Sequence, residues 1–522
     1  MMQSSPLTPS AQRLAAQLEA ATALQPESGQ TFHVASIGDT FYLAYEQLRN
    51  AAEYREHHLL LRSAIERYLK RYVDLRRYRP IGPELVTELT QAGYLANDSV
   101  PMAKVGQIDA LLLPYAALIE QAPQLGRGPR QLVVDWIYQI ASAQIGELLL
   151  PNRRLAVFMA FAYEHYLAAV DRAAGAEPGE TDQAYQVALY CAVQSSIFKS
   201  DLATTRYYCL AASLPTLSEQ SFGHFIQVNQ LIDDLQQAPR THRLARLINR
   251  YGSPMRILRE LVAGEGTAAL PPLNDRAEVV SRIKRLCQQQ YTLMHKRLGA
   301  RIIKTILFIF ITKVLLGVAL EVPYDLLAAG AIAWFPLVLN IMFPVVYMVL
   351  LSARISTPDR HNTELIASFV ERILYVSEQP VQYRLKQRVA SATQRSIFNA
   401  VYAVGFLVSF GLLLWALYQL HFNVVNGLIF FLFLSAVSFL GFRLRQSTRE
   451  LAMLDLRQGF FQTLADFLST PFVRVGYWLS DHYARLNLVT RILDIAIEMP
   501  LKTTLRLVQQ WIGFMRDKQE EL

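Results

Sequence analysis

Four apolar stretches in the second half of the chain constrain its fold more than any other feature. They run from about 302 to 320, 326 to 351, 397 to 420 and 424 to 442. Each is close to or longer than the roughly 20 residues that an α-helix needs to cross about 30 Å of hydrocarbon. Short connections separate the first stretch from the second and the third from the fourth. The sequence therefore predicts an all-α, multi-pass membrane protein with four transmembrane helices, arranged as two hairpins.

Positive charge is distributed unevenly about these stretches. The connections inside the hairpins, residues 321–325 and 419–423, contain no lysine or arginine, whereas the segments before, between and after the hairpins contain more than fifteen. Because lysine and arginine are retained on the cytoplasmic side, we expect both termini and the loop between the hairpins to be cytoplasmic. The N-terminus lacks the continuous apolar core of a signal peptide, and its one arginine gives little support to a transit peptide. We expect a prokaryotic plasma membrane.

A run of basic residues without any acidic residue lies directly before the first apolar stretch. Its seven members are Arg282, Lys284, Arg285, Lys296, Arg297, Arg301 and Lys304. Charge at this place favours anionic lipid headgroups as the partner, at about 1 kcal/mol for each residue near the surface. No aromatic RNA-binding set or CxxC finger accompanies it, so we expect no binding to nucleic acid.

The first 280 residues show amphipathic helical periodicity almost throughout, as in a soluble helical domain. Near the end of this region, a stretch rich in glycine and proline lies at 263–275, where we place a linker. Paired helices leave open a repeat array, although an irregular compact domain is the favoured interpretation. The predicted divisions are a helical cytoplasmic domain (1–262), a linker (263–274), a basic juxtamembrane helix (275–301), a first transmembrane hairpin (302–351), a cytoplasmic loop with an amphipathic helix (352–396), a second transmembrane hairpin (397–442) and a cytoplasmic amphipathic helical tail (443–522).

The loop and the tail both carry amphipathic helices. In the loop, apolar residues between 364 and 377 follow one helical face, and in the tail Pro471 and Pro500 are expected to separate successive helices. The apolar faces of the tail have two alternative partners. One is the lipid interface, with Trp478 and Trp511 as anchors, and the other is a protein groove in the same chain or a neighbouring protomer. The nearly equal mix of acidic and basic residues favours the groove.

Motifs that would indicate an enzyme are absent from the sequence. There is no GxGxxG, GxxxxGK[ST], GxSxG or HExxH, and no kinase signature. The three cysteines, Cys191, Cys209 and Cys287, form no CxxC pair and no metal-ligand spacing with histidine. We therefore expect a protein that is not an enzyme and that holds no cofactor or metal.

Lys313 is the residue whose position most needs an explanation, because it lies near the centre of the first apolar stretch. A charged residue there costs about 2.5–3.5 kcal/mol on insertion scales. Two interpretations remain open: Lys313 lines a water-filled path beside a second span kinked or broken at Pro336 and Pro344, or it pairs structurally inside a helix bundle. The nearest polar candidates for either role are Glu321, Asp325, Asn340 and Asn399.

These patterns lead to one functional hypothesis and two alternatives. The hypothesis is a membrane-anchored scaffold that presents its helical domain to a protein partner or to a second protomer. The first alternative is a homo-oligomeric channel or transporter with Lys313 lining the path, since four spans per chain are too few to enclose one alone. The second alternative is an intramembrane enzyme acting on lipid, which no residue pattern specifically favours.

Overall fold

The computed structural model describes most of the chain, and the described part is all-α. It covers residues 6–23, 29–34, 43, 46, 57–72, 80–122, 126–172, 181–213, 221–263, 273–353, 355, 358–385, 392–453 and 460–486. Its helices are α1 (Pro9–Ala23), α3 (His57–Tyr72), α4 (Gly82–Gln91), α5 (Met102–Gln121), α6 (Arg127–Leu149), α7 (Arg153–Ala169), α8 (Asp182–Val193), α9 (Leu202–Ser213), α10 (Phe222–Gln237), α11 (Pro239–Tyr251), α12 (Ser253–Ala263), α13 (Arg276–Leu316), α14 (Val322–Ala329), α15 (Trp334–Ala353), α16 (Arg360–Leu374), α17 (Ala392–Gln419), α18 (Val424–Arg449) and α19 (Phe460–Leu486). π-Helical turns lie at Gln194–Phe198 and Gly317–Glu321, and two short strands, β1 (Val170–Asp171) and β2 (Tyr383–Arg384), pair in parallel.

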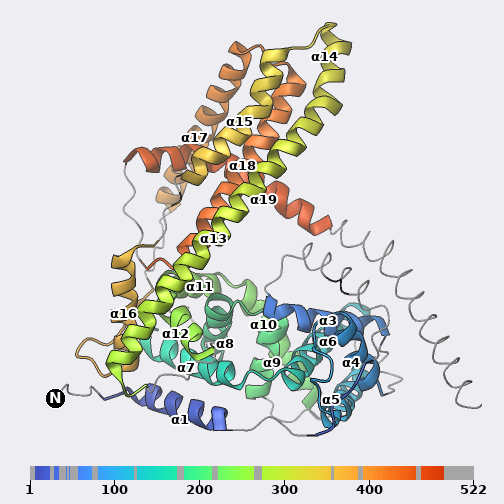
Figure 1. Ribbon diagram of the computed structural model, residues 1–522, viewed down its shortest axis with the longest axis vertical. Helices are drawn as coiled ribbons and strands as arrows, with labels where there is room; N and C mark the ends of the chain where they lie inside the picture. Colours follow the sequence, from blue (N-terminus) through green and yellow to red (C-terminus); the bar gives the residue numbers. More distant parts are fainter. Residues whose placement is uncertain are drawn as a thin grey trace, which may run out of the picture.

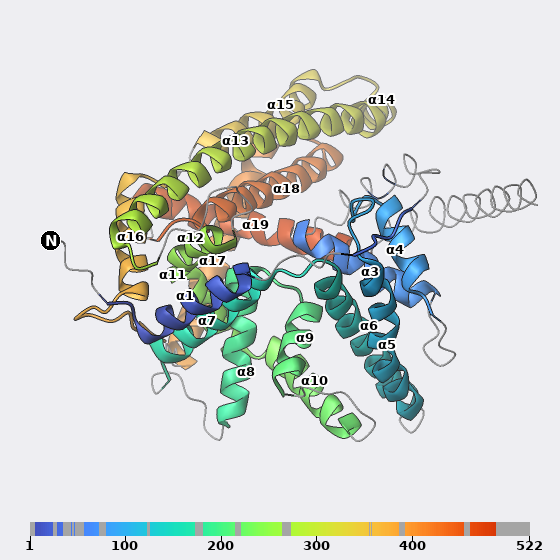
Figure 2. The ribbon, with the colours of Figure 1, turned by 60° about the horizontal axis from the view of Figure 1, so that its bottom comes forward.

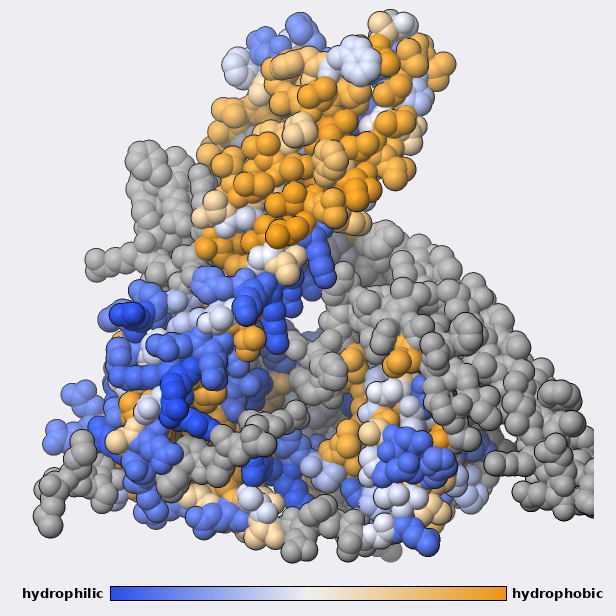
Figure 3. Space-filling model, viewed as in Figure 1, coloured by the Kyte–Doolittle hydropathy of each residue, from blue (hydrophilic) through white to orange (hydrophobic). Residues whose placement is uncertain are grey.

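The helices form a broad body and an elongated bundle that stands on it (Figure 1). The visible surface of the bundle is almost entirely hydrophobic, whereas the surface directly below it is mostly hydrophilic (Figure 3). Five segments are long and apolar enough to cross a membrane: four in the bundle (276–328, 334–353, 396–419 and 424–446) and α5 in the body. A continuous apolar surface of this extent indicates an integral, multi-pass membrane protein.

α13 joins the body to the bundle as a single helix of 41 residues. Asp275 caps its start, since its side chain accepts a hydrogen bond of 3.0 Å from the amide of Glu278. The basic segment therefore continues directly into the first apolar stretch. The body and the bundle are joined here by a continuous helical backbone rather than by a flexible turn.

The turn of the first hairpin lies later than the sequence indicated. The expected connection at 321–325 is wrong, because the helix continues through the π-turn at Gly317–Glu321 into α14. Pro323 directly follows the π-turn, where the amide of Val322 bonds to the carbonyl of Gly317 five residues back, and this break in the regular hydrogen-bond pattern accommodates a residue that has no amide hydrogen. The chain reverses only after Gly330, whose φ of +69° ends the helix in the left-handed region.

α15 and α19 both run through prolines at which the sequence predicted an interruption. Pro336 occupies the first turn of α15, and Pro344 lies inside the helix, which is nevertheless continuous. α19 likewise runs through Pro471, so the predicted separation there is wrong. Packing against neighbouring helices supports these positions, since Pro336, Pro344 and Pro471 are all buried. Pro500 and Trp511 lie outside the described residues.

The helices of the body form two groups (Figure 2), and each group has its own hydrophobic core. One is built from α3–α6, α9 and α10, and the other from α1, α7, α8, α11 and α12. The second core also includes Ile283 and Cys287 of α13 and Ile366 and Val370 of α16. The hydrophobic core therefore includes residues on both sides of the predicted linker, of which 264–272 lie outside the described residues, and the loop helix between the hairpins packs into the body.

Candidate functional site

Lys313 and Glu321 form an ion pair inside the bundle. Both side chains are 0% exposed, and Nζ of Lys313 lies 3.3 Å from Oε1 of Glu321. In a regular helix residues seven apart share a face, and the π-turn inserts one residue, so it brings a residue eight positions away onto that face. The ammonium also lies 4.5 Å from the ring centroid of Phe433 on α18. The charge that the sequence left unexplained is thus neutralised by an acid of the same helix.

A chain of polar side chains joins the two hairpins near their turns. Nδ2 of Asn423 donates to Oδ1 of Asp325 at 2.6 Å, and the other oxygen of Asp325 accepts from the amide of Ala333 at 3.2 Å. Asn423 also caps α18 by accepting from the amide of Asn426 at 2.8 Å. Nδ2 of Asn340 then donates to the carbonyl of Asn426 at 3.2 Å. These contacts fix α14, α15 and α18 to one another.

The ion pair and the asparagine contacts lie on the same three-helix interface. Gly317, one turn before Glu321, faces Leu337 and Ile341, which flank Asn340 on α15. Within the described residues, four buried polar atoms here have no hydrogen-bond partner: Oε2 of Glu321, Oδ1 of Asn340, and Oδ1 and Nδ2 of Asn426. Unpaired polar atoms in a bundle interior cost free energy, so this interface is less favourable than apolar packing would be and is the most unusual part of the described bundle.

The structure brings together Lys313, Glu321, Asp325 and Asn340 in one part of the bundle, but not Asn399. Asn399 is exposed on α17, which does not take part in this interface. The apolar stretches alone gave no way to assign which faces of α13, α15 and α17 meet. Sequence reasoning also missed Asn423 and Asn426. The sequence did contain a signal for them: Asn423 directly precedes an apolar stretch, at the position of a helix N-cap, and Asn426 lies in the first turn of that helix.

The basic residues of α13 do not all face the same surroundings. Arg285, Lys296, Arg297, Arg301 and Lys304 are exposed, and Arg282 is half-buried. Lys284 instead forms an ion pair of 2.6 Å with Glu364 of α16. The exposed set remains available to lipid headgroups, whereas Lys284 fastens the loop helix to α13.

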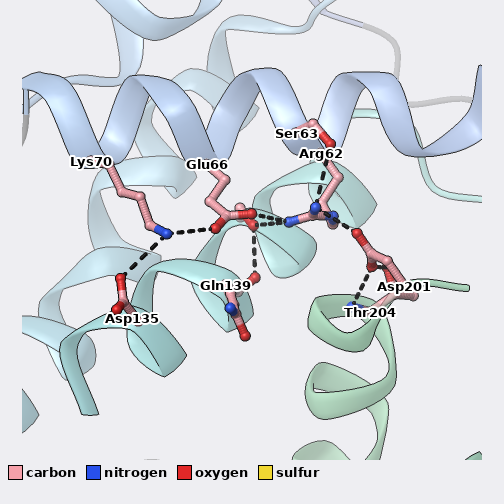
Figure 4. Close-up of polar contacts among 9 residues, drawn as sticks. Arg62, Ser63, Glu66, Lys70, Asp135, Gln139, Asp201 and Thr204 are labelled. Carbon is pink, nitrogen blue, oxygen red and sulfur yellow. Dashed lines mark hydrogen bonds and ion pairs between the residues drawn. The ribbon is translucent and has the colours of Figure 1, made fainter. Parts of the chain in front are cut away.

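A second cluster of charges lies in the body, between α3, α6 and α9 (Figure 4). The buried Arg62 contacts Glu66 at 2.6 Å and Asp201 at 2.5 Å, and Lys70 contacts Glu66 at 2.9 Å and Asp135 at 3.3 Å. Burial raises the pKa of Glu66, but the charges of Arg62 and Lys70 together outweigh it and leave that pKa below its usual value. Every charge in the cluster is paired, which indicates that it holds three helices together.

The chain leaving the last span is fastened to the body. We call residues 450–453, directly after α18, the exit segment. The buried Arg256 of α12 donates to the carbonyls of Glu450, at 2.6 Å, and Ser196, at 2.9 Å. Asn362 of α16 donates to the carbonyl of Leu451 and accepts from the amide of Met453, both at 2.8 Å. The body therefore holds the chain directly after α18, through α12 and the loop helix α16.

The described residues contain no group of three or more His, Cys, Asp or Glu that could bind a metal ion. Comparisons of the chain with models of protein families, with curated proteins and with solved structures gave no match. The function has to be inferred from the geometry of this chain alone.

Proposed function

We propose that this protein is a membrane-anchored scaffold, in which a helical body on the cytoplasmic side is presented to a partner by two membrane hairpins. One observation carries the proposal: the body holds the membrane region at three separate places along the chain. These are the entry through α13, the loop helix α16 and the exit segment. One flexible connection would be enough to attach the body to the membrane, whereas holding the body in a fixed orientation requires contacts at several places.

We further propose that four of the five apolar segments cross the membrane and that α5 does not. α5 buries Ile108, Leu112 and Tyr115 in a core of the body. Asp109, in the middle of α5, accepts hydrogen bonds from the amides of Ile81, at 2.7 Å, and Gly82, at 3.1 Å. A carboxylate that binds the first amides of α4 fits a core helix of a soluble body better than a helix in lipid.

The orientation with both termini in the cytoplasm rests on the distribution of lysine and arginine. Lys296, Arg297, Arg301 and Lys304 are exposed beside the start of the exposed apolar run Ile303, Leu307 and Phe308 on α13, and this position fits anionic headgroups of the cytoplasmic leaflet. The full burial of Lys313 against Glu321 and Phe433 supports structural pairing over a residue that lines a path.

Photocrosslinking of the full chain in its native membrane tests the scaffold. The full chain is used because residues of α13 and α16 complete the core of the body, and a fragment ending before α13 would lack them. A photoreactive amino acid replaces Leu113 or Leu132, which are 56% and 55% exposed on the body. We expect a discrete adduct with one protein or with a second copy of the chain. A matched probe at Phe398, 67% exposed on α17, is expected to capture lipid. Body probes that yield no discrete protein adduct would contradict the proposal.

A further inference from the structure

α19 has three sides of different character. Phe472 and Gly476 face the bundle: the ring of Phe472 lies 4.9 Å from that of Phe410, and a Cβ on Gly476 would come within 2.3 Å of the carbonyl oxygen of Ser435. Helical spacing places an apolar flank on one side of this face and a polar flank on the other. The apolar flank consists of Phe467, Leu468, Val475 and Trp478, and the polar flank of Asp466, Thr470, Arg474, Tyr477 and Asp481.

Contacts with the spans show which way the polar flank faces. Asp466 pairs at 2.8 Å with Arg445, beyond the apolar part of α18. The guanidinium of Arg474 lies 4.5 Å from the ring centroid of Tyr402, in the third turn of α17. The polar flank is therefore directed toward the ends of the spans that join the body.

The other sides of α19 meet the spans farther from the body. Phe467 lies against Gly405, one turn farther along α17 than Tyr402, and Phe472 meets Phe410 and Phe431 farther still. Figure 1 shows α19 lying across the bundle rather than along it. A helix in this position lies across the spans, with its polar flank nearer the body than its apolar flank.

We propose that α19 is an interfacial helix, and that its apolar flank binds the lipid surface of the cytoplasmic leaflet. This inference rests on the proposed function, which supplies the orientation. Trp478 is 58% exposed and Tyr477 61%, and aromatic residues of this kind concentrate at the headgroup level. Beyond Gly405 the same side of α17 is apolar and exposed, and Val408 and Leu412 there are 51% and 67% exposed, so the flank lies beside a continuing apolar surface. That continuity identifies lipid, rather than a separate protein, as what covers it. The sequence had favoured a protein groove, and α19 divides its surface between protein and lipid.

Quenching of tryptophan fluorescence by brominated lipids tests the inference on the full chain. The purified protein is reconstituted in vesicles whose lipids carry bromine either near the headgroup or near the chain ends. Four variants, Trp136→Phe, Trp334→Phe, Trp415→Phe and Trp478→Phe, each remove one described tryptophan. We expect Trp478→Phe to reduce the quenched emission about as much as Trp415→Phe, whose tryptophan is 63% exposed on α17. The reduction for Trp478→Phe is expected to be larger with bromine near the headgroup.

Trp136 is the internal control, because it is 5% exposed in the body and donates to Asp233. Removing it should raise the quenched share of the emission. If Trp334→Phe and Trp415→Phe reduce quenching but Trp478→Phe does not, α19 is not on the lipid surface, and the scaffold proposal is unaffected. If none of these three variants reduces quenching, the bundle is not in lipid, and both proposals are wrong.

Discussion

Removing one partner of the Lys313–Glu321 pair is expected to destabilise the bundle far more than removing both. The two charged atoms are 3.3 Å apart and fully buried. At an effective dielectric constant of about 20, Coulomb's law assigns about 5 kcal/mol to their attraction. Lys313→Met leaves a buried carboxylate without its counter-charge, and such single losses cost about 3–5 kcal/mol. The double variant Lys313→Met, Glu321→Gln leaves no charge, and its cost should be close to zero.

The measurement is a double-mutant cycle on the full chain. Unfolding is driven by a denaturing detergent in mixed micelles and followed by circular dichroism, for the wild type, both single variants and the double variant. We expect a coupling free energy of at least about 3 kcal/mol between the two positions, because the double variant should recover the loss of either single variant. Lys304→Met, which removes an exposed lysine from the same helix, is the matched control and should show almost no coupling to Glu321→Gln. Additive single effects would refute the reasoning, because they would mean that the two charges do not stabilise one another.

Three further predictions concern other contacts. Gly476→Ala should destabilise the chain by about 1–3 kcal/mol, because the added Cβ would meet the backbone of α18. Gly427→Ala is the control, since a Cβ there meets open space, and thermal melts of the two variants give the comparison. Arg256→Ala should cost about 3 kcal/mol and speed hydrogen exchange in the exit segment, while the exposed Arg285→Ala leaves exchange there unchanged. Burial lowers the pKa of His165 to about 4, below its unfolded value near 6.5. The stabilisation of the folded state by the neutral His165 is therefore complete above about pH 6.5 and is lost as the pH falls toward 4. Melting temperatures at about pH 7.5 and pH 5 should therefore differ less in His165→Phe than in the wild type, and equal differences would exclude this role.

The helices of the bundle were predictable because a membrane imposes a simple requirement on composition and length. A span must be apolar over about 20 residues and must satisfy its backbone hydrogen bonds internally, and four stretches met that requirement. The turn at 321–325 was mispredicted because Glu321, Pro323 and Asp325 are typical of a loop. In the structure Glu321 is paired with Lys313 of the same helix and Asp325 with Asn423 at the start of α18, and the π-turn accommodates the proline.

Pairing between distant segments was the part that a single sequence could not supply. The amphipathic face of the loop helix was recognised, with its bounds shifted from 364–377 to Arg360–Leu374, but nothing indicated that it would pack on α12 and α13. Val376, expected on its apolar face, is 56% exposed beyond the end of the helix. Asn399 was grouped with Lys313 because both lie in apolar stretches, and only the packing of the helices separates them. Helical periodicity assigns a buried face but not the partner that covers it.

Measuring the membrane topology of the chain by cysteine labelling tests most directly whether the body is cytoplasmic and is carried by four spans. Cys191, Cys209 and Cys287 are buried, so a cysteine placed at an exposed position provides the accessible thiol. A membrane-impermeant maleimide is applied to intact cells expressing Ala331→Cys, in the turn of the first hairpin, Gln382→Cys, in the loop between the hairpins, or Leu113→Cys, in α5. We expect labelling of Ala331→Cys in intact cells, and of Gln382→Cys and Leu113→Cys only after lysis. Labelling of Gln382→Cys in intact cells, or protection of Leu113→Cys after lysis, would contradict the account.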